Sequence, residues 1–282
     1  MRVRYFLSIM ILALCSCATG PNSRIPKTGP VETPLSLQQI STQRQSLSSR
    51  KDYTPLSLEL PKILNLDDIV RHPGYTASYN HTTLCPYWVA YELTSEEVNG
   101  SYRGKESFCW DPLLSGRQAN REDYRNDMQW DKGHMAPKAD MRWSTQAYEE
   151  SYYLTNICPQ NHSFNAGIWC TTEKLARRMA ERYDKVYIIC GPIFDKQMYG
   201  TLGESRVAIP DRFFKALLVP KGNSYSAIAF ILNNSPKNKS LKESTLSVNE
   251  LEKLINRDLF SALDDKIEEA IEANISYGDW GL

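Results

Sequence analysis

The sequence predicts an α+β fold, because its strand-like segments do not alternate strictly with its helical ones. One segment alternates aromatic and β-branched residues with smaller ones, and three others are apolar runs bounded by Gly, Pro or Asn. These four predicted strands cover residues 86–94, 185–194, 213–220 and 226–234. Helices are predicted over 165–183 and, as a pair, from residue 248 to 273. Apolar segments recur from residue 62 onward without a linker, so we expect one folded domain over residues 61–282.

Residues 1–17 have the pattern of an export signal rather than of a folded segment. Two arginines precede an apolar run over residues 5–14, which is too short to span a bilayer. The run ends in Leu-Cys-Ser-Cys, which is similar to the lipobox of bacterial lipoproteins and makes Cys17 the residue to be lipidated. We therefore expect an exported bacterial lipoprotein, anchored in the membrane through Cys17 and sorted, given Ala18, to the outer membrane. An ordinary cleaved signal peptide is the alternative.

The next segment, residues 18–60, is rich in Ser, Thr, Pro and Gln, which predicts a flexible tether. Five cysteines remain after the leader, so at least one thiol is unpaired. Cys85 and Cys109 flank one predicted hairpin and are our candidate disulfide, since export permits disulfide formation. For the other three cysteines we expect buried free thiols.

Charge is balanced along the chain, with 33 basic and 33 acidic residues. This balance argues against a protein that coats nucleic acid through bulk charge, but it leaves open an enzyme with a local basic groove. The acidic run at 264–269 is expected to be a solvent-exposed helix face.

His134 is the candidate catalytic residue, in a short polar segment between more apolar flanks. A lone histidine is more often structural than catalytic, but imidazole is suited to taking a proton from water near neutral pH. Gly133 is expected to give the backbone freedom beside it. None of the four histidines is paired at the HExxH spacing of a zinc protease.

A second candidate element follows in the predicted helix from residue 165. At about 100° per residue, one helix face displays an amide, an indole, a carboxylate and a guanidinium. These belong to Asn165, Trp169, Glu173 and Arg177. Taken alone, Glu173 and Arg177 would form an ordinary surface ion pair at i,i+4 spacing.

The segments DKGHMAPKAD and NICPQ, followed by NxGxWxxxE and an arginine four residues later, resemble the DNA/RNA non-specific endonuclease family. That family has the ββα-metal, or His-Me finger, active-site motif and includes secreted bacterial nucleases and mitochondrial endonuclease G. The likeness covers roughly residues 70–260. It implies a central, mostly antiparallel sheet with a ββα-metal motif.

Position by position, the resemblance implies a role for each matching residue. His134 is the general base that activates water, and Asn165 is the single direct protein ligand of a divalent cation, Mg²⁺ or alternatively Mn²⁺. Glu173 holds metal-bound waters, and Arg177 neutralises charge developing on the phosphoryl oxygens. Asp131 is expected to be a structural hydrogen-bond acceptor, as is Asp140.

Two departures from the family pattern concern substrate binding. Lys132 stands where the family usually has arginine, and lysine is not an equivalent bidentate phosphate clamp. The family's phosphate-binding arginine before an aromatic-x-x-Asp stretch has two candidate counterparts here, Arg103 and Lys105.

The resemblance therefore implies an exported, Mg²⁺-dependent endonuclease that hydrolyses phosphodiester bonds of both DNA and RNA with little base readout. A catalytically weak or inactive nucleic-acid-binding lipoprotein on the same fold is the alternative, as is a phosphodiesterase acting on a different substrate.

Overall fold

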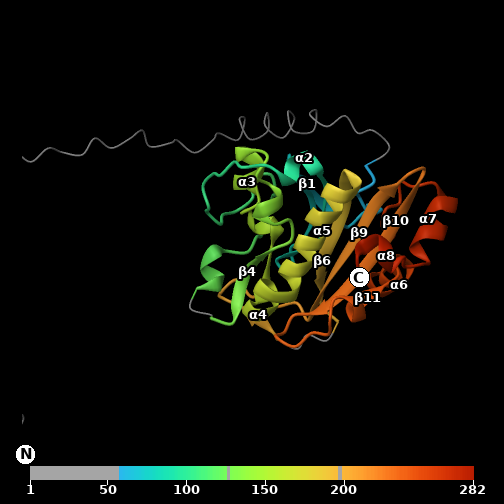
Figure 1. Ribbon diagram of the computed structural model, residues 1–282. Helices are drawn as coiled ribbons and strands as arrows, with labels where there is room; N and C mark the ends of the chain where they lie inside the picture. Colours follow the sequence, from blue (N-terminus) through green and yellow to red (C-terminus); the bar gives the residue numbers. More distant parts are fainter. Residues whose placement is uncertain (1–56, 126–127, 196–198) are drawn as a thin grey trace, which may run out of the picture. The chain divides into compact units, whose positions relative to one another are not determined.

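The computed structural model describes residues 57–125, 128–195 and 199–282 (Figure 1). The predicted signal peptide with Cys17, and most of the predicted tether, lie outside these residues. Leu58 is buried in the same apolar cluster as Trp88, so the packed domain begins slightly before the predicted boundary at residue 61. Among the helices of the described ranges, none is long and apolar enough to cross a membrane.

The centre of the domain is an antiparallel sheet, in which seven strands are hydrogen-bonded in the order β1-β2-β3-β6-β9-β10-β11 within the described ranges. Their bounds are Asp68–Arg71, Thr76–Asn80, Cys85–Thr94, Lys185–Ile193, Arg212–Lys221, Ser224–Asn233 and Thr245–Leu246. All their pairings are antiparallel, which confirms the predicted α+β fold with its antiparallel sheet.

Both faces of this sheet are buried, which explains why its central strands are near-continuous apolar runs. In β9, Phe213 and Leu217 belong to the apolar cluster on one face, while Phe214 and Leu218 belong to the cluster on the other. Helix α5 (Cys170–Tyr183) packs on β6 and β9 from the first face, and α6 (Val248–Ile255) and α7 (Asp265–Glu272) pack on β10 (Figure 1).

A separate two-stranded ribbon lies between β3 and β6 in the chain and carries the predicted catalytic histidine. Its strands are β4 (Trp130–His134) and β5 (Ile157–Asn161), paired antiparallel with His134 opposite Ile157. The connection between them contains η2 (Lys138–Asp140), α3 (Thr145–Glu150) and η3 (Leu154–Asn156). After β5 the chain turns at once into α4 (His162–Phe164), so two antiparallel strands are followed directly by helix.

Short elements complete the described structure. They are α2 (Ser95–Val98), η1 (Arg121–Tyr124), β7 (Thr201–Leu202), β8 (Val207–Ala208), η5 (Lys242–Ser244) and α8 (Tyr277–Trp280).

The predicted disulfide is wrong, because Cys85 and Cys109 are both free. Cys85 is buried at the start of β3, with its Sγ 3.6 Å from the carbonyl oxygen of Ala208, whereas Cys109 is exposed and pairs through its backbone with Tyr153. The other three cysteines are free as well: Cys158 and Cys190 are buried, as predicted, but Cys170 is only half-buried.

Candidate active site

His134 ends strand β4, and its main chain is held on both sides. The indole Nε1 of Trp169 donates to the carbonyl oxygen of His134 at 3.1 Å, which joins the ribbon to the helix that follows it. The next residues are held by Asn156, whose side chain accepts from the amide of Ala136 and donates to its carbonyl oxygen, both at 2.8 Å. Trp169 and Asn156 are both fully buried, so the histidine stands on a rigid base.

Gly133 owes its place to a close contact rather than to backbone freedom, which corrects the sequence-based expectation. It sits in the regular register of β4, opposite Cys158, and its φ lies outside the left-handed region. A Cβ at this position would come within 2.1 Å of the Gln160 Oε1 atom, and Gln160 is fully buried. Only glycine therefore lets the buried amide approach the strand so closely.

Aromatic rings form the walls around the His134 imidazole. The ring of Tyr152 lies edge-on to it with centroids 5.1 Å apart, and the ring of Phe108 lies 5.6 Å away. Burial and the nearby Lys138 cation lower the pKa of His134 to about 4, although Glu106 acts in the opposite sense. The imidazole is therefore neutral at pH 7, and its buried Nε2 has no hydrogen-bond partner among the described residues.

Asn165 lies where the helix after β5 is locally widened. Residues Asn165–Trp169 form a turn of π-helix, and Gly167 within it has non-helical φ and ψ of −97° and −107°. The regular helical wheel expected over 165–183 therefore holds only from Cys170 onward, although the predicted extent of the helix is correct. Such π-turns are frequent at functional sites.

The side chain of Asn165 is oriented by Asp131. Its Nδ2 donates to Asp131 Oδ2 at 2.9 Å, and its amide Oδ1 has no hydrogen-bond partner among the described residues. Asp131 also accepts from His162 Nδ1 at 3.1 Å. These contacts agree with the expectation that Asp131 is a structural acceptor.

Arg177 pairs with Asp140 rather than with Glu173. Its guanidinium Nη1 donates to Asp140 Oδ1, and the fully buried Asp140 carboxylate also accepts from Tyr91 Oη at 2.9 Å. The surface ion pair considered from the sequence is therefore not formed, and Asp140 has the structural acceptor role expected for it. Glu173, one turn earlier, is half-buried, and burial raises the pKa of its carboxyl to about 7.

Lys132 and Arg103 are placed differently relative to His134. Lys132 Nζ lies over the rings of Phe108, at 5.5 Å, and of Tyr124, at 5.2 Å, and burial lowers its pKa. It thus shares the Phe108 ring with His134. Arg103 is exposed and follows Tyr102, whose amide donates to the carbonyl oxygen of Arg142 shortly before α3, and no described contact links Arg103 to the histidine.

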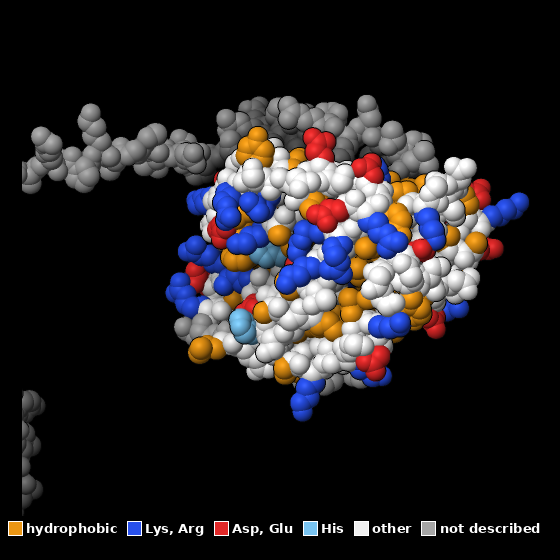
Figure 2. Space-filling model, in the orientation of Figure 1, with side chains coloured by type: hydrophobic (Ala, Val, Ile, Leu, Met, Phe, Trp, Pro, Cys, Tyr) orange, Lys and Arg blue, Asp and Glu red, His pale blue; other side chains and the backbone are white. Residues whose placement is uncertain are grey.

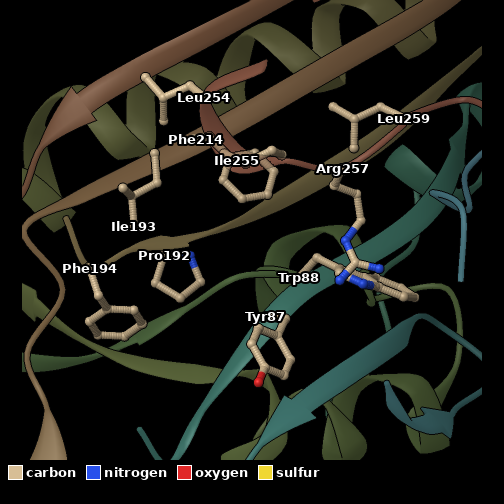
Figure 3. Close-up of a pocket in the computed structure, with 10 residues that line it drawn as sticks. All are labelled: Tyr87, Trp88, Pro192, Ile193, Phe194, Phe214, Leu254, Ile255, Arg257 and Leu259. Atoms are coloured by element: carbon tan, nitrogen blue, oxygen red, sulfur yellow. The ribbon is translucent and has the colours of Figure 1, made fainter. Parts of the chain in front are cut away.

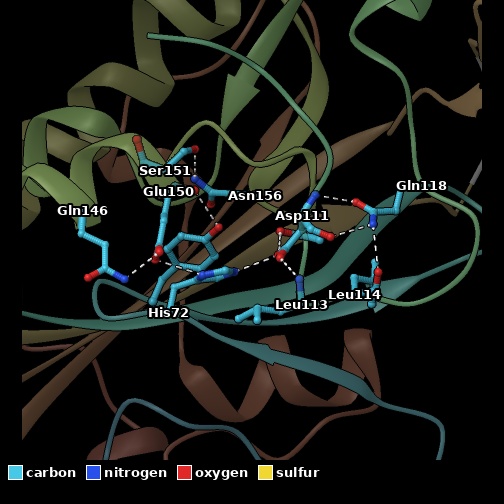
Figure 4. Close-up of polar contacts among 11 residues, drawn as sticks. His72, Asp111, Leu113, Leu114, Gln118, Gln146, Glu150, Ser151 and Asn156 are labelled. Carbon is cyan, nitrogen blue, oxygen red and sulfur yellow. Dashed lines mark hydrogen bonds and ion pairs between the residues drawn. The ribbon is translucent and has the colours of Figure 1, made fainter. Parts of the chain in front are cut away.

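A buried ionic network fixes the segment that carries Phe108. His72 lies between two carboxylates, with Nε2 2.8 Å from Asp111 Oδ2 and Nδ1 3.1 Å from Glu150 Oε2 (Figure 4). Burial opposes charge on this imidazole, but its hydrogen bonds to Asp111 and Glu150 outweigh burial and raise the pKa of His72 to about 9. Asp111 also accepts from Thr155 Oγ1 at 2.6 Å. The network therefore anchors the 108–118 segment to α3 through Glu150 and to η3 through Thr155.

Positive charge gathers around the site although the chain as a whole is neutral. Figure 2 shows Lys and Arg side chains clustered around a histidine on the face that carries α3 and α5. Lys138, Lys174 and Arg178 are exposed on these elements or next to them. The balanced net charge of the chain did not exclude a local basic groove, and these side chains form such a basic surface.

The residues present fit a hard divalent cation held mainly through water. Asn165 offers an amide oxygen and Glu173 a half-buried carboxylate, and Mg²⁺ prefers oxygen ligands and keeps several waters. In the described part of the chain no group of three or more His, Cys, Asp or Glu could hold a metal ion. A site with one direct protein ligand, where a second residue contacts the metal-bound waters, does not require such a group.

A cavity of about 190 Å³ lies elsewhere in the domain (Figure 3). Its lining includes Trp88, Phe214 and Leu259, which belong to the apolar cluster on the sheet face opposite α5. It is therefore separate from His134 and its neighbours.

Sequence reasoning missed several residues of the site. The ring walls Phe108 and Tyr152 come from separate segments, and only the fold brings them to His134. Lys215, by contrast, left a signal, because it is a lysine inside the apolar run of a predicted buried strand.

Comparisons with known proteins identify the family of this chain. The profile of the DNA/RNA non-specific endonuclease family matches residues 62–266. The mitochondrial nuclease EXOG of Danio rerio is 34% identical over 208 residues, covering 68% of this chain and 60% of that protein. A nuclease of Serratia marcescens is 29% identical over 213 residues, covering 73% of this chain and 79% of that protein.

Known structures show the same fold. One chain of an EndoG/EndoGI complex matches with a TM-score of 0.67 and 23% identity, covering 75% of this chain and 92% of that one. The chain spans 57 to 60% of the length of the EXOG relatives from three vertebrates. The matched region contains β4, β5 and α5 together with His134, Asn165, Glu173 and Arg177. The chain belongs to the DNA/RNA non-specific endonuclease family.

Proposed function

We propose that this protein is a Mg²⁺-dependent endonuclease that hydrolyses phosphodiester bonds of DNA and RNA, with His134 as general base. The observation that carries the proposal is the state of that histidine. It is neutral at pH 7, its main chain is fixed by Trp169, and its Nε2 has no described partner. A buried, unpartnered imidazole nitrogen is costly to stability, and a water molecule that gives up its proton there would satisfy it.

A bound phosphodiester would also raise the basicity of His134. Burial and Lys138 hold its pKa low in the free protein, because both disfavour the imidazolium. A phosphate anion beside the ring favours the imidazolium, so proton transfer becomes easier once substrate is bound. The imidazole of His134 therefore stays neutral in the free protein and accepts a proton more readily once substrate is bound.

The remaining groups orient and neutralise the phosphate. Asn165 Oδ1 would hold the cation directly, with Glu173 receiving hydrogen bonds from its waters. When bound, Mg²⁺ supplies charge stabilisation at the leaving 3′ oxygen. Arg177, held by Asp140, faces the charge that develops on the phosphoryl oxygens.

The surface around the site fits a polynucleotide rather than a small phosphodiester. The basic side chains over α3 and α5 can contact several phosphates in succession (Figure 2). Trp110 and Tyr102 are 59% and 58% exposed in the segment before β4 and offer faces on which bases can stack. Such contacts carry little sequence information, which supports low base specificity.

The direct test incubates purified protein with plasmid DNA and with RNA, with Mg²⁺ or Mn²⁺ and with chelator. We expect cleavage of both polymers that chelator abolishes, and loss of at least about 10²-fold in rate for His134→Ala and for Asn165→Ala. His81→Ala is the matched control, because His81 is a surface histidine bonded to Asp68 and to the Arg117 carbonyl oxygen.

Each outcome decides between the candidates. Wild-type protein that binds but leaves both polymers intact would favour the inactive binding protein, for which Lys132 in place of arginine is the motivating feature. Cleavage by His134→Ala at the wild-type rate would refute the base assignment, and undiminished metal-dependent cleavage by Asn165→Ala would refute the ligand assignment.

A further inference from the structure

Lys215 breaks the alternation of strand β9. Residues Phe213, Leu217 and Val219 of this strand face the cluster under α5 and are apolar, and Lys215 occupies the same face between them. It is 0% exposed, in the central part of the sheet, paired through its backbone with Cys190 of β6 and Phe230 of β10. A lysine is almost never fully buried unless it has a partner.

The Lys215 ammonium has no hydrogen-bond partner among the described residues, but it is not electrostatically isolated. Its Nζ lies 4.0 Å from the ring centroid of Trp169, the residue that holds the His134 carbonyl. Among the cations, its charge lowers the pKa of Glu173 the most, ahead of that of Arg177, and it also lowers the pKa of Asp140. The lysine therefore projects from the sheet toward the underside of the site.

We propose that Lys215 is a positioning residue that supplies the counter-charge for the Glu173 carboxylate from beneath the site. Arg177 cannot fill this role fully, because its guanidinium is committed to the buried Asp140. Without a second cation, the buried Asp140 and the half-buried Glu173 would share Arg177 as their counter-charge. Glu173, which does not hydrogen-bond the guanidinium, would then become protonated. Glu173 has its carboxyl pKa raised to about 7 by burial even with Lys215 present.

This proposal rests on the proposed function, in which Glu173 accepts hydrogen bonds from metal-bound waters. Glu173 accepts them best when its carboxyl is ionised. Several groups act on this carboxylate from the surrounding elements. They are Lys215 of β9, Asp140 of η2, Lys174 and Arg177 of α5, Tyr91 of β3 and Cys190 of β6. Among the cations of the described residues that lower the pKa of Glu173, Lys174 and Arg177 are on the helix of Glu173 itself, and Lys215 alone comes from the sheet.

The closing experiment is a double-mutant cycle on thermal stability in chelator, which does not depend on nuclease activity. Lys215→Met and Glu173→Gln each leave one charge unbalanced, whereas the double variant removes both. We expect the fall in Tm of the double variant to be smaller than the sum of the single falls by at least about 2 °C. Lys221→Met with Glu173→Gln is the control cycle and is expected to be additive, because Lys221 lies on the same strand but is exposed and pairs with Asp279.

Additive falls in Tm in the Lys215 cycle would overturn the proposal. Additivity is the result expected if Lys215 balanced the charge of Asp140 and not that of Glu173. If Lys215→Met does not fold, Lys215→Gln replaces it in the same cycle. A second readout applies once nuclease activity is shown. We expect the acid limb of the pH–rate profile to move up by about one unit or more in Lys215→Met and to return in Lys215→Arg. A uniform loss of rate with an unmoved limb would indicate a merely structural lysine and contradict the proposal.

Discussion

At the residue scale, the catalytic candidate is defined by what surrounds it. His134 has two aromatic walls, a main chain tied to Trp169 and a neighbouring glycine that admits Gln160. The histidine could be chosen from the sequence because its segment matched a known pattern. Its lowered pKa could not, since the cause is burial by rings from distant segments.

Gly133 allows a test of this local packing. Gly133→Ala places a methyl group where the Gln160 side chain now sits, and Gln160 has no exposed surface into which to move. We expect a loss of about 1–3 kcal/mol in the free energy of unfolding, together with reduced cleavage, because β4 would shift beside His134. Urea unfolding measures the first effect. Gly278→Ala is the control for adding a methyl group, because a Cβ there meets open space and the φ of Gly278 lies outside the left-handed region. A Gly133→Ala variant as stable as wild type would show that Gln160 can move freely.

At the scale of elements, the long apolar strands and the helices were predictable from hydrophobic pattern. Strands β3, β6, β9 and β10 and helices α5, α6 and α7 lie where the sequence predicted them. The short strands β1, β4 and β5 were not predicted, because each is held by tertiary contacts rather than by its own pattern. The π-turn at Asn165–Trp169 was not predicted either. A regular helical wheel already places Asn165 and Trp169 on one face, so the sequence pattern does not reveal the local widening.

Helix α7 confirms the charge pattern for most of the acidic run but has a buried carboxyl just beyond it. Asp264, Asp265 and Glu269 are exposed and Glu268 is half-buried, whereas Glu272, which was not part of the run, is 2% exposed. Burial and the neighbouring carboxylates Glu252, Glu268 and Asp258 raise the pKa of Glu272 from 4.5 to about 9. The folded state therefore keeps this proton to a higher pH than the unfolded chain does.

The consequence is a pH-dependent stability that belongs to α7. The contribution of Glu272 is complete below pH 4.5 and is lost as the pH rises toward about 9. We expect Tm to fall across this range in wild type and to fall less steeply in Glu272→Gln, which is neutral throughout. The exposed Glu269→Gln on the same helix is the control. Equal slopes for wild type and Glu272→Gln would show that the carboxyl is ionised in the folded protein.

At the scale of the whole molecule, the predicted export and lipid anchor concern residues outside the described ranges. They rest on the pattern before Cys17 alone. The family assignment is independent of them, since its profile begins at residue 62.

The anchor has a direct test in bacterial cells. Cys17→Ser should release the protein from the membrane fraction into the soluble exported fraction, because the thiol that would carry the lipid is gone. Incorporation of labelled palmitate into wild type but not into Cys17→Ser measures the modification itself. Cys15→Ser is the matched control and should stay in the membrane. Wild-type protein found entirely in the soluble fraction would instead support the ordinary cleaved signal peptide.

The alternation along β9 has an implication for how this protein can change over evolutionary time. Lys215 points toward the site under α5, while its neighbours Phe214 and Ala216 point into the opposite cluster. A substitution at Phe214 or Ala216 therefore alters the packing of the far face, whereas a substitution at Lys215 alters the charge under α5. Variation in the cavity on the far face can accumulate without replacing any side chain of the site, so the two faces can drift at different rates on one shared strand.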